Sequence, residues 1–577
     1  MSSRYVRFAI AAALVALAAV AIVGASSAKN APNKLDKINH VVVIYEENHS
    51  FDNLYGTWEG VDGVANADAA HTTQIAQNGQ AYTCLKQNDV NLAPLAAACT
   101  TGFEASAAFP NGPFLIDSYI PASATTCPKP NGAFAPNGFL NGAGLPGGCT
   151  KDIVHRYYQE QFQIDGGKQD RYVQGSDAAG LVMGRYDTQA LPIYKYLHSD
   201  GAPHYAIADR FFQGAFGGSY LNHAVLVAGA AQAWDNSAGV GLPVDNTGGS
   251  NDIHSVVDAN GMPNNSYPLY TSPIGNNVKD NALTASCAPG AGRPATPAGV
   301  TCGDYAVNTI QPWYWPFSPG TADARRLPPL TTPNIGDELS AKGVDWAWYS
   351  GGWSNANGYT DQPGYTNGAG PTCTDPDARP GSTWPKCPDV NFQYHHQAFN
   401  YWATYAPGTD ARAKHLLDEE SFISDATSSD AQCNLKAVSF IKPVGEENEH
   451  PGYTSEVRGS DHLVELLKDI EGSACAKDTM VVVTYDEFGG AWDHVPPPGP
   501  GSPTAGPHDK WGPGTRVPAL IVAPELPGNF VVDHAEHDTT SILATIEHRF
   551  GVAPLTGRDA TVNDLSTVYD GKQVSAQ

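Results

Sequence analysis

The sequence predicts an α/β protein with a large, mostly parallel central sheet flanked by helices. Continuous aliphatic runs recur at wide spacing, and segments with helical periodicity lie between them. Parallel strands that are covered on both faces are continuously apolar, whereas strands with one wet face alternate between apolar and polar residues. The pattern therefore favours a sheet with helices on both sides.

Four aliphatic runs are the expected strands of this sheet. They are Ile38–Tyr45, Ala437–Pro443, Met480–Tyr485 and Val517–Ala523. Ligands of open α/β sheets bind beyond the carboxyl ends of the strands. The residues that follow each run are therefore the first candidates for a functional site.

Two helices are expected between and after these strands. The first runs from Ser460, a plausible N-cap, to Ile470, with leucines 463, 466 and 467 on its apolar face. The second runs from His537 to Phe550 and ends before Gly551, a residue type that commonly follows a helix.

The N-terminus has the features of a secretory signal peptide. Arg4 and Arg7 precede an apolar run from Phe8 to Val23, and small residues follow up to Ala28. We expect cleavage after Ala28, with an uncleaved membrane anchor as the alternative. The mature chain, residues 29–577, is then expected to be secreted or periplasmic and to form one catalytic domain.

Two long segments of this domain are rich in Gly, Pro, Asn and Thr and lack sustained periodicity. Residues 233–335 and 354–391 are expected to be loop excursions over the site, or a small subdomain, pinned by disulfides. Ten cysteines suit an exported chain, and none has the spacing of a structural zinc site. The pairing with the shortest loops is Cys84/Cys99, Cys127/Cys149, Cys287/Cys302, Cys373/Cys387 and Cys433/Cys475.

Charge excludes one class of partner. The chain has 33 Lys and Arg against 59 Asp and Glu, a formal net charge of −26, and no basic run. A nucleic-acid backbone is therefore repelled. An anionic small substrate needs a local positive centre, such as a metal ion or protonated histidines.

Oxygen ligands follow two of the expected strands. Glu47 and Asn48 come after the first, and Asp486 and Glu487 come after the third. Each pair alone could be an ordinary cap or turn. Carboxylates that converge at neighbouring strand ends, however, repel each other unless a cation lies between them. An all-oxygen set suits Ca²⁺, Mg²⁺ or Mn²⁺ better than Zn²⁺.

A candidate nucleophile and four histidines complete the set. Ser219 follows Gly217-Gly218 in an N-cap-like position before an apolar helix over 221–231, where the helix dipole favours phosphate or an alkoxide. An ordinary capping serine is the alternative. Polar and aromatic residues surround four histidines that could bind phosphoryl oxygens and protonate a leaving group in mildly acidic medium. They are His155, His395, His396 and His450.

Five ordered motifs carry a family resemblance. They are INHVVVIYEENHSFDNLYG, FGGSYLNH, EHPGYTSEVRGSDHLV, TYDEFGGAWDHVPPP and HDTTSILATIEHRFG, spread from residue 38 to about 551. Together they resemble the bacterial phosphoesterase family of secreted acid phosphatases and phospholipases C, within the alkaline-phosphatase-like superfamily.

The resemblance implies metal-assisted phosphoryl transfer. One divalent metal ion is held by Glu47, Asn48, Asp486 and Glu487, and by Ser219, which attacks phosphorus to form a phosphoserine. His155, His450 and one of His395 or His396 would hold the phosphoryl oxygens, and one of them donates the leaving-group proton. Asp493 or His494 is either a further ligand or a structural pair.

The same resemblance favours an acid phosphatase acting on small phosphomonoesters. Phospholipase C members typically carry threonine in the nucleophile segment, where this chain has Ser219. The alternatives are a phospholipase C, which would act on membrane lipid, and a catalytically silent phosphate-binding protein.

Overall fold

The computed structural model divides the chain into two compact units, residues 1–37 and 38–577. It describes residues 34–76, 79–85, 109–118, 152–176, 179–232, 255–256, 305–306, 310–321, 323, 326–429, 431–509 and 511–574. The predicted signal peptide, residues 1–28, and most of the excursion over 233–335 lie outside the described residues. In the first unit, Lys34–Lys37 form a short 3-10 helix.

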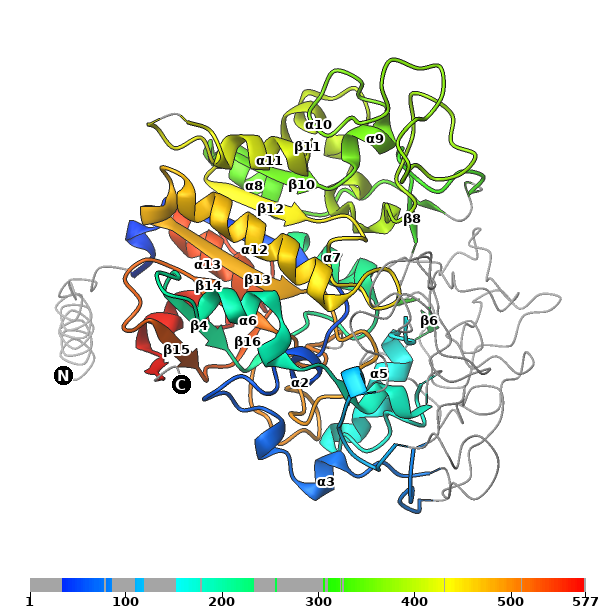
Figure 1. The fold of residues 1–577 in the computed structure, drawn as a ribbon, viewed down its shortest axis with the longest axis vertical. Helices are drawn as coiled ribbons and strands as arrows, with labels where there is room; N and C mark the ends of the chain where they lie inside the picture. Colours follow the sequence, from blue (N-terminus) through cyan, green and yellow to red (C-terminus); the bar gives the residue numbers. More distant parts are fainter. Residues whose placement is uncertain are drawn as a thin grey trace, which may run out of the picture. The chain divides into compact units, whose positions relative to one another are not determined.

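The second unit is built on a nine-stranded sheet (Figure 1). Its order is β11 (Leu416–Asp418), β10 (Trp346–Ser350), β12 (Val438–Lys442), β1 (His40–Glu46), β13 (Thr479–Tyr485), β14 (Ala519–Val522), β4 (Tyr205–Ala208), β15 (Phe530–Asp533) and β17 (Lys572–Gln573). The four aliphatic runs of the sequence are β1, β12, β13 and β14, and the predicted α/β class is confirmed.

The sheet is mixed rather than uniformly parallel. Strands β11, β10, β12, β1 and β13 are parallel neighbours, whereas β14 runs antiparallel to both β13 and β4. Strand β15 is parallel to β4, and β17 is antiparallel to β15. The carboxyl ends of β12, β1 and β13 therefore lie side by side, and β14 ends at the opposite edge.

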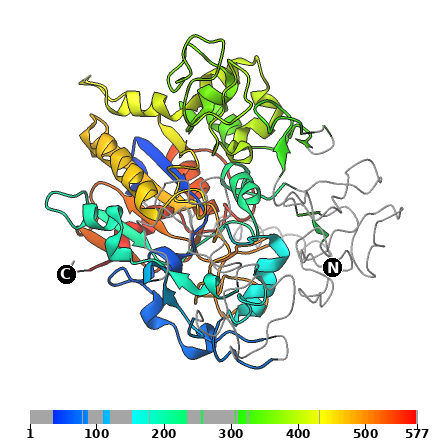
Figure 2. The same ribbon diagram turned by 45° about the vertical axis from the view of Figure 1, so that its right-hand side comes forward.

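Helices cover both faces of the sheet. Helices α6 (Pro192–Leu197), α11 (Glu419–Ala426) and α12 (Glu456–Gly472) pack together on one face, and α12 crosses in front of β1 in Figure 2. Helices α7 (Ser219–Ala228), α8 (Ile335–Lys342) and α13 (Thr540–Phe550) form the other layer. Burial on both sides explains the continuous aliphatic sequence of β1 and β13, whose core residues have no exposed surface or almost none.

Short elements fill the loops around this framework. The further helices are α2 (Phe51–Leu54), α3 (Ala69–Thr72), α5 (Tyr157–Ile164), α9 (Trp353–Asn357) and α10 (Asp410–His415). Two-stranded sheets pair β2 (Phe114–Leu115) with β3 (Gly184–Arg185), β5 (Phe211–Phe212) with β16 (His537–Asp538), β6 (Ser255–Val256) with β7 (Tyr305–Ala306), and β8 (Gln311–Pro312) with β9 (Arg326–Leu327).

Two predicted helix starts are wrong. Ser455 caps α12, with its side chain accepting a hydrogen bond from the backbone N–H of Arg458, whereas Ser460 lies buried inside the helix. Its hydroxyl oxygen accepts a hydrogen bond from the backbone N–H of Ile193 at 2.9 Å. Likewise α13 begins at Thr540, because His537 and Asp538 pair with β5 first. Contacts with distant segments thus explain why α12 and α13 begin at other residues than predicted.

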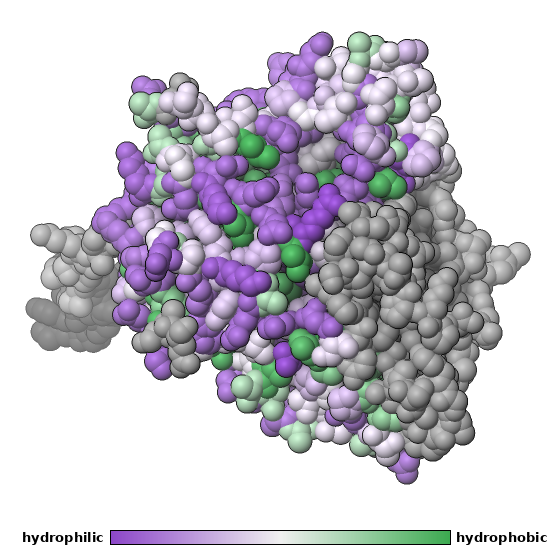
Figure 3. All heavy atoms as spheres, viewed as in Figure 1, coloured by the Kyte–Doolittle hydropathy of each residue, from purple (hydrophilic) through white to green (hydrophobic). Residues whose placement is uncertain are grey.

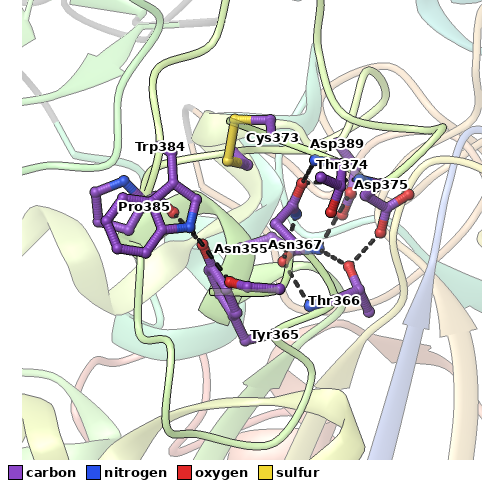
Figure 4. The surroundings of a disulfide bond; sticks show 12 residues. Asn355, Tyr365, Thr366, Asn367, Cys373, Thr374, Asp375, Trp384, Pro385 and Asp389 are labelled. Carbon is purple, nitrogen blue, oxygen red and sulfur yellow. Dashed lines mark hydrogen bonds between the residues drawn. A yellow bond between two sulfur atoms is a disulfide. The ribbon is translucent and has the colours of Figure 1, made fainter. Parts of the chain in front are cut away.

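Disulfide Cys373–Cys387 joins two parts of the excursion over 354–391 (Figure 4). Around it, the side-chain oxygen of Asn367 accepts hydrogen bonds from the backbone N–H groups of Thr374 and Asp375, both at 3.0 Å. Cys433–Cys475 is also formed. These two predicted pairs are confirmed, and each of the other three includes a cysteine outside the described residues.

The view of the surface in Figure 3 is largely hydrophilic over the described residues. Among them, Tyr359 is the exposed large hydrophobic side chain, at 38%. Within the part of the chain that the structure describes, no helix has the length and apolarity needed to cross a bilayer.

Candidate active site

Four oxygen-bearing side chains meet beyond β1 and β13. Glu47, Asn48, Asp486 and Glu487 are at most 2% exposed. The backbone N–H groups of Asn48 and Glu487 both donate to the Asp486 Oδ1 atom, at 3.1 and 2.8 Å. Because Glu46 pairs with Tyr485 in the sheet, the two strands deliver the residues that follow them to the same place. The predicted convergence of the two strand ends is thus present in the fold.

The amide of Asn48 tests whether a cation fits this cluster. Its nitrogen lies 3.1 Å from His450 Nε2. Its oxygen then faces Glu47 Oε2 at 2.8 Å and Glu487 Oε1 at 3.1 Å, with no donor between the three oxygens. The opposite orientation turns the nitrogen to the carboxylates and needs no ion. A divalent cation makes the first orientation favourable, and this set of oxygens fits a hard cation.

The balance of charges around the cluster also favours a bound cation. Burial, followed by the charge of Asp486, raises the pKa of both Glu47 and Glu487, while Lys442 opposes the shift at Glu47. Burial also raises the pKa of Asp486, whose Oδ2 atom has no hydrogen-bond partner. One ammonium group cannot compensate three buried carboxylates. A divalent cation would remove this deficit.

Ser219 faces the cluster from the first residue of α7. Gly218 is the N-cap, so Ser219 is not itself the cap as the sequence suggested. Gly217 has φ +97°, a conformation that favours glycine, and the Asn222 side chain donates to the carbonyls of Gly217 and Gly218 at 3.2 and 3.3 Å. The Ser219 hydroxyl donates to Glu47 Oε2 at 3.3 Å. The turn therefore aims a hydroxyl, at a helix N-terminus, into the oxygen cluster.

The four predicted histidines surround the same cluster. His155 Nε2 lies 3.3 Å from Glu487 Oε1, and His450 Nε2 lies 3.1 Å from the Asn48 amide. His396 Nδ1 lies 3.3 Å from Glu47 Oε1. The His395 ring packs edge-on against His396 at 4.3 Å and is less buried. In the doublet, His396 is therefore the inner ring, which contacts Glu47, and His395 is the outer ring.

Two residues of this site escaped the sequence reasoning. Lys442, at the end of β12, is 1% exposed, forms an ion pair with Glu47 and donates to the carbonyl of Tyr45 at 2.8 Å. His223, one turn after Ser219, lies 3.9 Å from Glu47 Oε1 and stacks on His396. Lys442 had a signal, since it ends an aliphatic run at the carboxyl edge. His223 had only its helical spacing from Ser219.

Asp493 and His494 belong to a different cluster. Asp493 accepts hydrogen bonds from Arg516 Nε at 3.1 and 3.3 Å, and His494 Nδ1 contacts Asp52 Oδ2 at 2.5 Å. Burial opposes the charge of His494, but Asp52 and Asp62 raise its pKa to about 9. Arg516 and His494 thus supply the cations that these carboxylates need, which favours a structural network.

Burial keeps the inner histidines neutral. It lowers the pKa of His396 and His450 well below the usual range, with nearby histidines and Lys442 adding to the effect. The pKa of His395 falls to about 3 through burial and then His155 and Lys442. In the free protein these rings are therefore neutral, rather than the cations expected in mildly acidic medium.

This shift predicts acid sensitivity. A histidine with a pKa near 6.5 when unfolded and about 3 when folded binds more protons in the unfolded state between those values. Its contribution to stability is therefore lost as pH falls from about 6.5 toward 3. We expect His395→Gln to lose less thermal stability than the wild type between pH 7 and pH 4, measured by scanning calorimetry. Equal losses would contradict the shift.

A buried carboxylate holds the nucleophile turn. Glu160 on α5 accepts hydrogen bonds from the Gly217 N–H at 2.6 Å, from Gln213 Nε2 at 2.9 Å and from the Thr515 N–H at 2.7 Å. The oxygen of the same Gln213 accepts from the Phe488 N–H at 2.9 Å. Glu160 and Gln213 thus connect the turn before Ser219 to the segment that carries Glu487.

We expect Glu160→Gln to lower kcat for phosphoester hydrolysis by roughly 10²-fold with little change in KM. The amide presents a donor to groups that donate, so the turn shifts, and a displacement of about 1 Å costs a factor of this size. Steady-state kinetics checks it, with Glu420→Gln, the same exchange at an exposed glutamate, as the control. Unchanged kcat in the folded variant would contradict the positioning role.

Comparison with known proteins identifies the family of this chain. The sequence profile of the Phosphoesterase family matches residues 38–553. This chain belongs to the Phosphoesterase family. The match includes β1, α7, β12 and β13, and with them every residue of the oxygen cluster.

Curated relatives match a smaller part of the chain. Phospholipase C B of Mycobacterium tuberculosis is 35% identical over 156 residues, which is 24% of this chain and 30% of that protein. Non-specific phospholipase C6 of Arabidopsis thaliana is 33% identical over 140 residues, 21% of this chain and 26% of the relative. Non-hemolytic phospholipase C of Pseudomonas aeruginosa is 28% identical, covering 25% of each chain. The matched stretches thus span less than a third of these relatives.

Solved structures with some likeness are more distant. The match to a protein in the alkaline phosphatase superfamily from Vibrio parahaemolyticus covers 40% of this chain and 50% of that protein, with a TM-score of 0.21 and 14% identity. The match to a 2-O GAG sulfatase covers 69% of this chain and 72% of that protein, with a TM-score of 0.27 and 12% identity.

Proposed function

We propose that this member of the Phosphoesterase family is a metal-dependent phosphoric ester hydrolase with Ser219 as its nucleophile. The observation that carries the proposal is the Ser219 hydroxyl at the head of α7, hydrogen-bonded to Glu47 Oε2 within a buried oxygen cluster. A hydroxyl in that position has an acceptor for its proton and lies at the positive end of the helix dipole.

The residues of the site divide the reaction into two displacements. Ser219 Oγ attacks phosphorus as its proton passes to Glu47 Oε2, and the P–O bond to the leaving alcohol breaks. His155 is well placed to donate a proton to that alcohol, because it lies at the cluster and is more exposed than His396. Water then attacks the phosphoserine, which releases phosphate and restores the serine hydroxyl.

Glu47, Asn48, Asp486, Glu487 and Ser219 would hold one divalent cation. Such an ion lowers the pKa of the serine hydroxyl and neutralises charge that develops on the phosphoryl oxygens. The rings of His396 and His450 lie beside the cluster and would contact the same oxygens. Ca²⁺, Mg²⁺ and Mn²⁺ suit the oxygen set better than Zn²⁺.

For the substrate, we propose small phosphomonoesters. A monoester presents three free phosphoryl oxygens, and His155, His395, His396 and His450 surround the cluster where these oxygens would bind. Serine in the nucleophile segment also supports the acid phosphatase branch. The second candidate is a phospholipase C, which the names of the matched relatives favour.

One assay separates these candidates. The purified chain is tested on p-nitrophenyl phosphate and on p-nitrophenyl phosphorylcholine from pH 4 to 9. Each assay is repeated after chelation and after return of Mg²⁺, Mn²⁺ or Ca²⁺. Metal-dependent turnover of the monoester supports a phosphatase. Preference for the diester supports a phospholipase C, and no turnover of either would contradict hydrolase function.

We also propose that the protein acts outside the cytoplasm. Disulfides Cys373–Cys387 and Cys433–Cys475 support this site of action, because disulfides persist in oxidising compartments. The predicted signal peptide leads to the same expectation.

A further inference from the structure

Lys442 is a buried ammonium group that the end of a strand brings to the active site. It is the last residue of β12 and is 1% exposed. Ile441 pairs with Ile44 in the sheet, so the next residue of β12 reaches the end of β1. The Nζ atom of Lys442 donates to the carbonyls of Tyr45 at 2.8 Å and Glu46 at 3.3 Å, and it lies 5.5 Å from the centre of the Tyr45 ring. Two carbonyls and an aromatic ring therefore hold the ammonium in one place.

The two oxygens of the Glu47 carboxylate have different neighbours. Oε1 forms the ion pair with Lys442 and lies 3.3 Å from His396 Nδ1. Oε2 accepts the hydrogen bond from the Ser219 hydroxyl at 3.3 Å and lies 2.8 Å from the Asn48 amide. Lys442 therefore binds one oxygen of Glu47, and the other oxygen remains for the nucleophile and the proposed metal ion.

Side chains of the kinds that bind metal ions gather around Glu47 Oε1. One ligand atom from each of Glu47, His223 and His396 lies within 4.8 Å of the others. The Nε2 atom of His223 is buried without a hydrogen-bond partner and lies 3.9 Å from Oε1. A carboxylate with two imidazoles has the donor set of a transition-metal site. The ammonium of Lys442, however, already lies on the same oxygen.

We propose that Lys442 is a positioning residue that takes the place of a second metal ion. Its ammonium excludes a dication from Oε1 by charge repulsion, which is strong where water is excluded. It also fixes the Glu47 carboxylate, so that Oε2 stays directed at the Ser219 hydroxyl. Lys442 thus acts through Glu47 and not on the substrate. The inference rests on the proposed function, because it assumes one cation and one nucleophile beside Oε2.

Lys442→Met tests the positioning role. The exchange removes the charge and nearly keeps the length of the side chain, so Glu47 loses the partner of Oε1 and shifts relative to Ser219. We expect kcat for p-nitrophenyl phosphate to fall roughly 10²-fold with little change in KM, because a shift of about 1 Å costs a factor of this size. Without substrate, Mn²⁺ should bind about 10- to 100-fold more weakly, as when other outer partners of metal ligands are removed. Lys477→Met, the same exchange at an exposed lysine, is the control.

Chemical rescue separates positioning from a general loss of structure. Lys442→Ala removes a propyl chain with its amino group, which propylammonium can replace. We expect propylammonium to raise kcat at least about 10-fold in a saturable manner, because it returns a cation to the buried Glu47 carboxylate. The neutral 1-propanol has the same length and should have no effect. Equal effects of the two compounds would overturn the inference. If Lys442→Met fails to fold, Lys442→Gln replaces it, since its amide keeps an N–H donor and removes only the charge.

Metal stoichiometry tests whether Lys442 replaces a second ion. The purified full chain is stripped of metal and dialysed against Mn²⁺, and bound Mn²⁺ is counted by mass spectrometry. We expect one ion per chain, which His223→Gln retains. Two ions, one of them lost in His223→Gln, would overturn the inference and leave the proposed function intact. Wild-type kcat and Mn²⁺ affinity in folded Lys442→Met would do the same. A wild-type chain that neither binds Mn²⁺ nor hydrolyses a p-nitrophenyl ester would overturn the proposed function, and the inference with it.

Discussion

Ser219→Ala should abolish phosphoester hydrolysis while leaving the fold nearly unchanged, and it should weaken metal binding because one of the five proposed ligands is lost. The Ser219 side chain has one hydrogen bond from its hydroxyl, to Glu47 Oε2 at 3.3 Å, and Gly218 rather than Ser219 caps α7. Losing the hydroxyl therefore costs little stability but removes the attacking atom. We expect kcat to fall by about 10³-fold or more, as for other nucleophile deletions.

The measurement is steady-state hydrolysis of p-nitrophenyl phosphate, together with thermal unfolding and metal content. Ser199→Ala removes an exposed hydroxyl and should match the wild type. A direct test of the intermediate is rapid acid quenching with labelled substrate, which should trap label on the wild-type chain but not on Ser219→Ala. Full activity in Ser219→Ala would refute the assignment of the nucleophile.

Glu47→Gln should impair both metal binding and catalysis. Glu47 is the point where the hydroxyl of Ser219, the ammonium of Lys442 and the imidazole of His396 meet. A neutral amide removes an anionic ligand and leaves Lys442 buried without its ion-pair partner. Loss of an outer partner of a ligand already costs 10- to 100-fold in metal affinity, so we expect a loss of at least about 10²-fold here.

Titration with Mn²⁺ and hydrolysis at saturating Mn²⁺ separate the two effects. Activity should stay at least about 10²-fold below the wild type even at saturation, because the acceptor for the Ser219 proton is also gone. Glu420→Gln, an exposed glutamate elsewhere, is the control for the substitution type. Wild-type affinity in Glu47→Gln would show that Glu47 is not a ligand.

The composition of the oxygen cluster could be predicted from local sequence. Aliphatic runs mark β1 and β13, and the residues that follow such runs in a parallel sheet come to one edge. This edge is a consequence of strand direction alone. The cluster of Glu47, Asn48, Asp486 and Glu487 could therefore be predicted without knowledge of any contact. Ser219 could be predicted for a similar reason, since two glycines before an apolar run indicate a tight turn into a helix.

Other features depended on contacts between residues far apart in the chain. Lys442 lies 396 positions from Glu46, whose carbonyl it contacts at 3.3 Å, and only the pairing of β12 with β1 brings them together. The different positions of His395 and His396 come from packing against His223. The reversed direction of β14 and the pairing of Asp493 with Arg516 are also long-range results.

The sequence by itself thus determined which residue types arrive at the carboxyl edge of the sheet, because strand periodicity and turn chemistry are local. The tertiary structure alone decided which of them touch. It joined Ser219, Lys442 and His396 to Glu47, and it separated Glu46 from Glu47 onto the opposite face of β1. The reason is physical: neighbouring side chains on a strand point to opposite faces, so adjacent glutamates meet different partners.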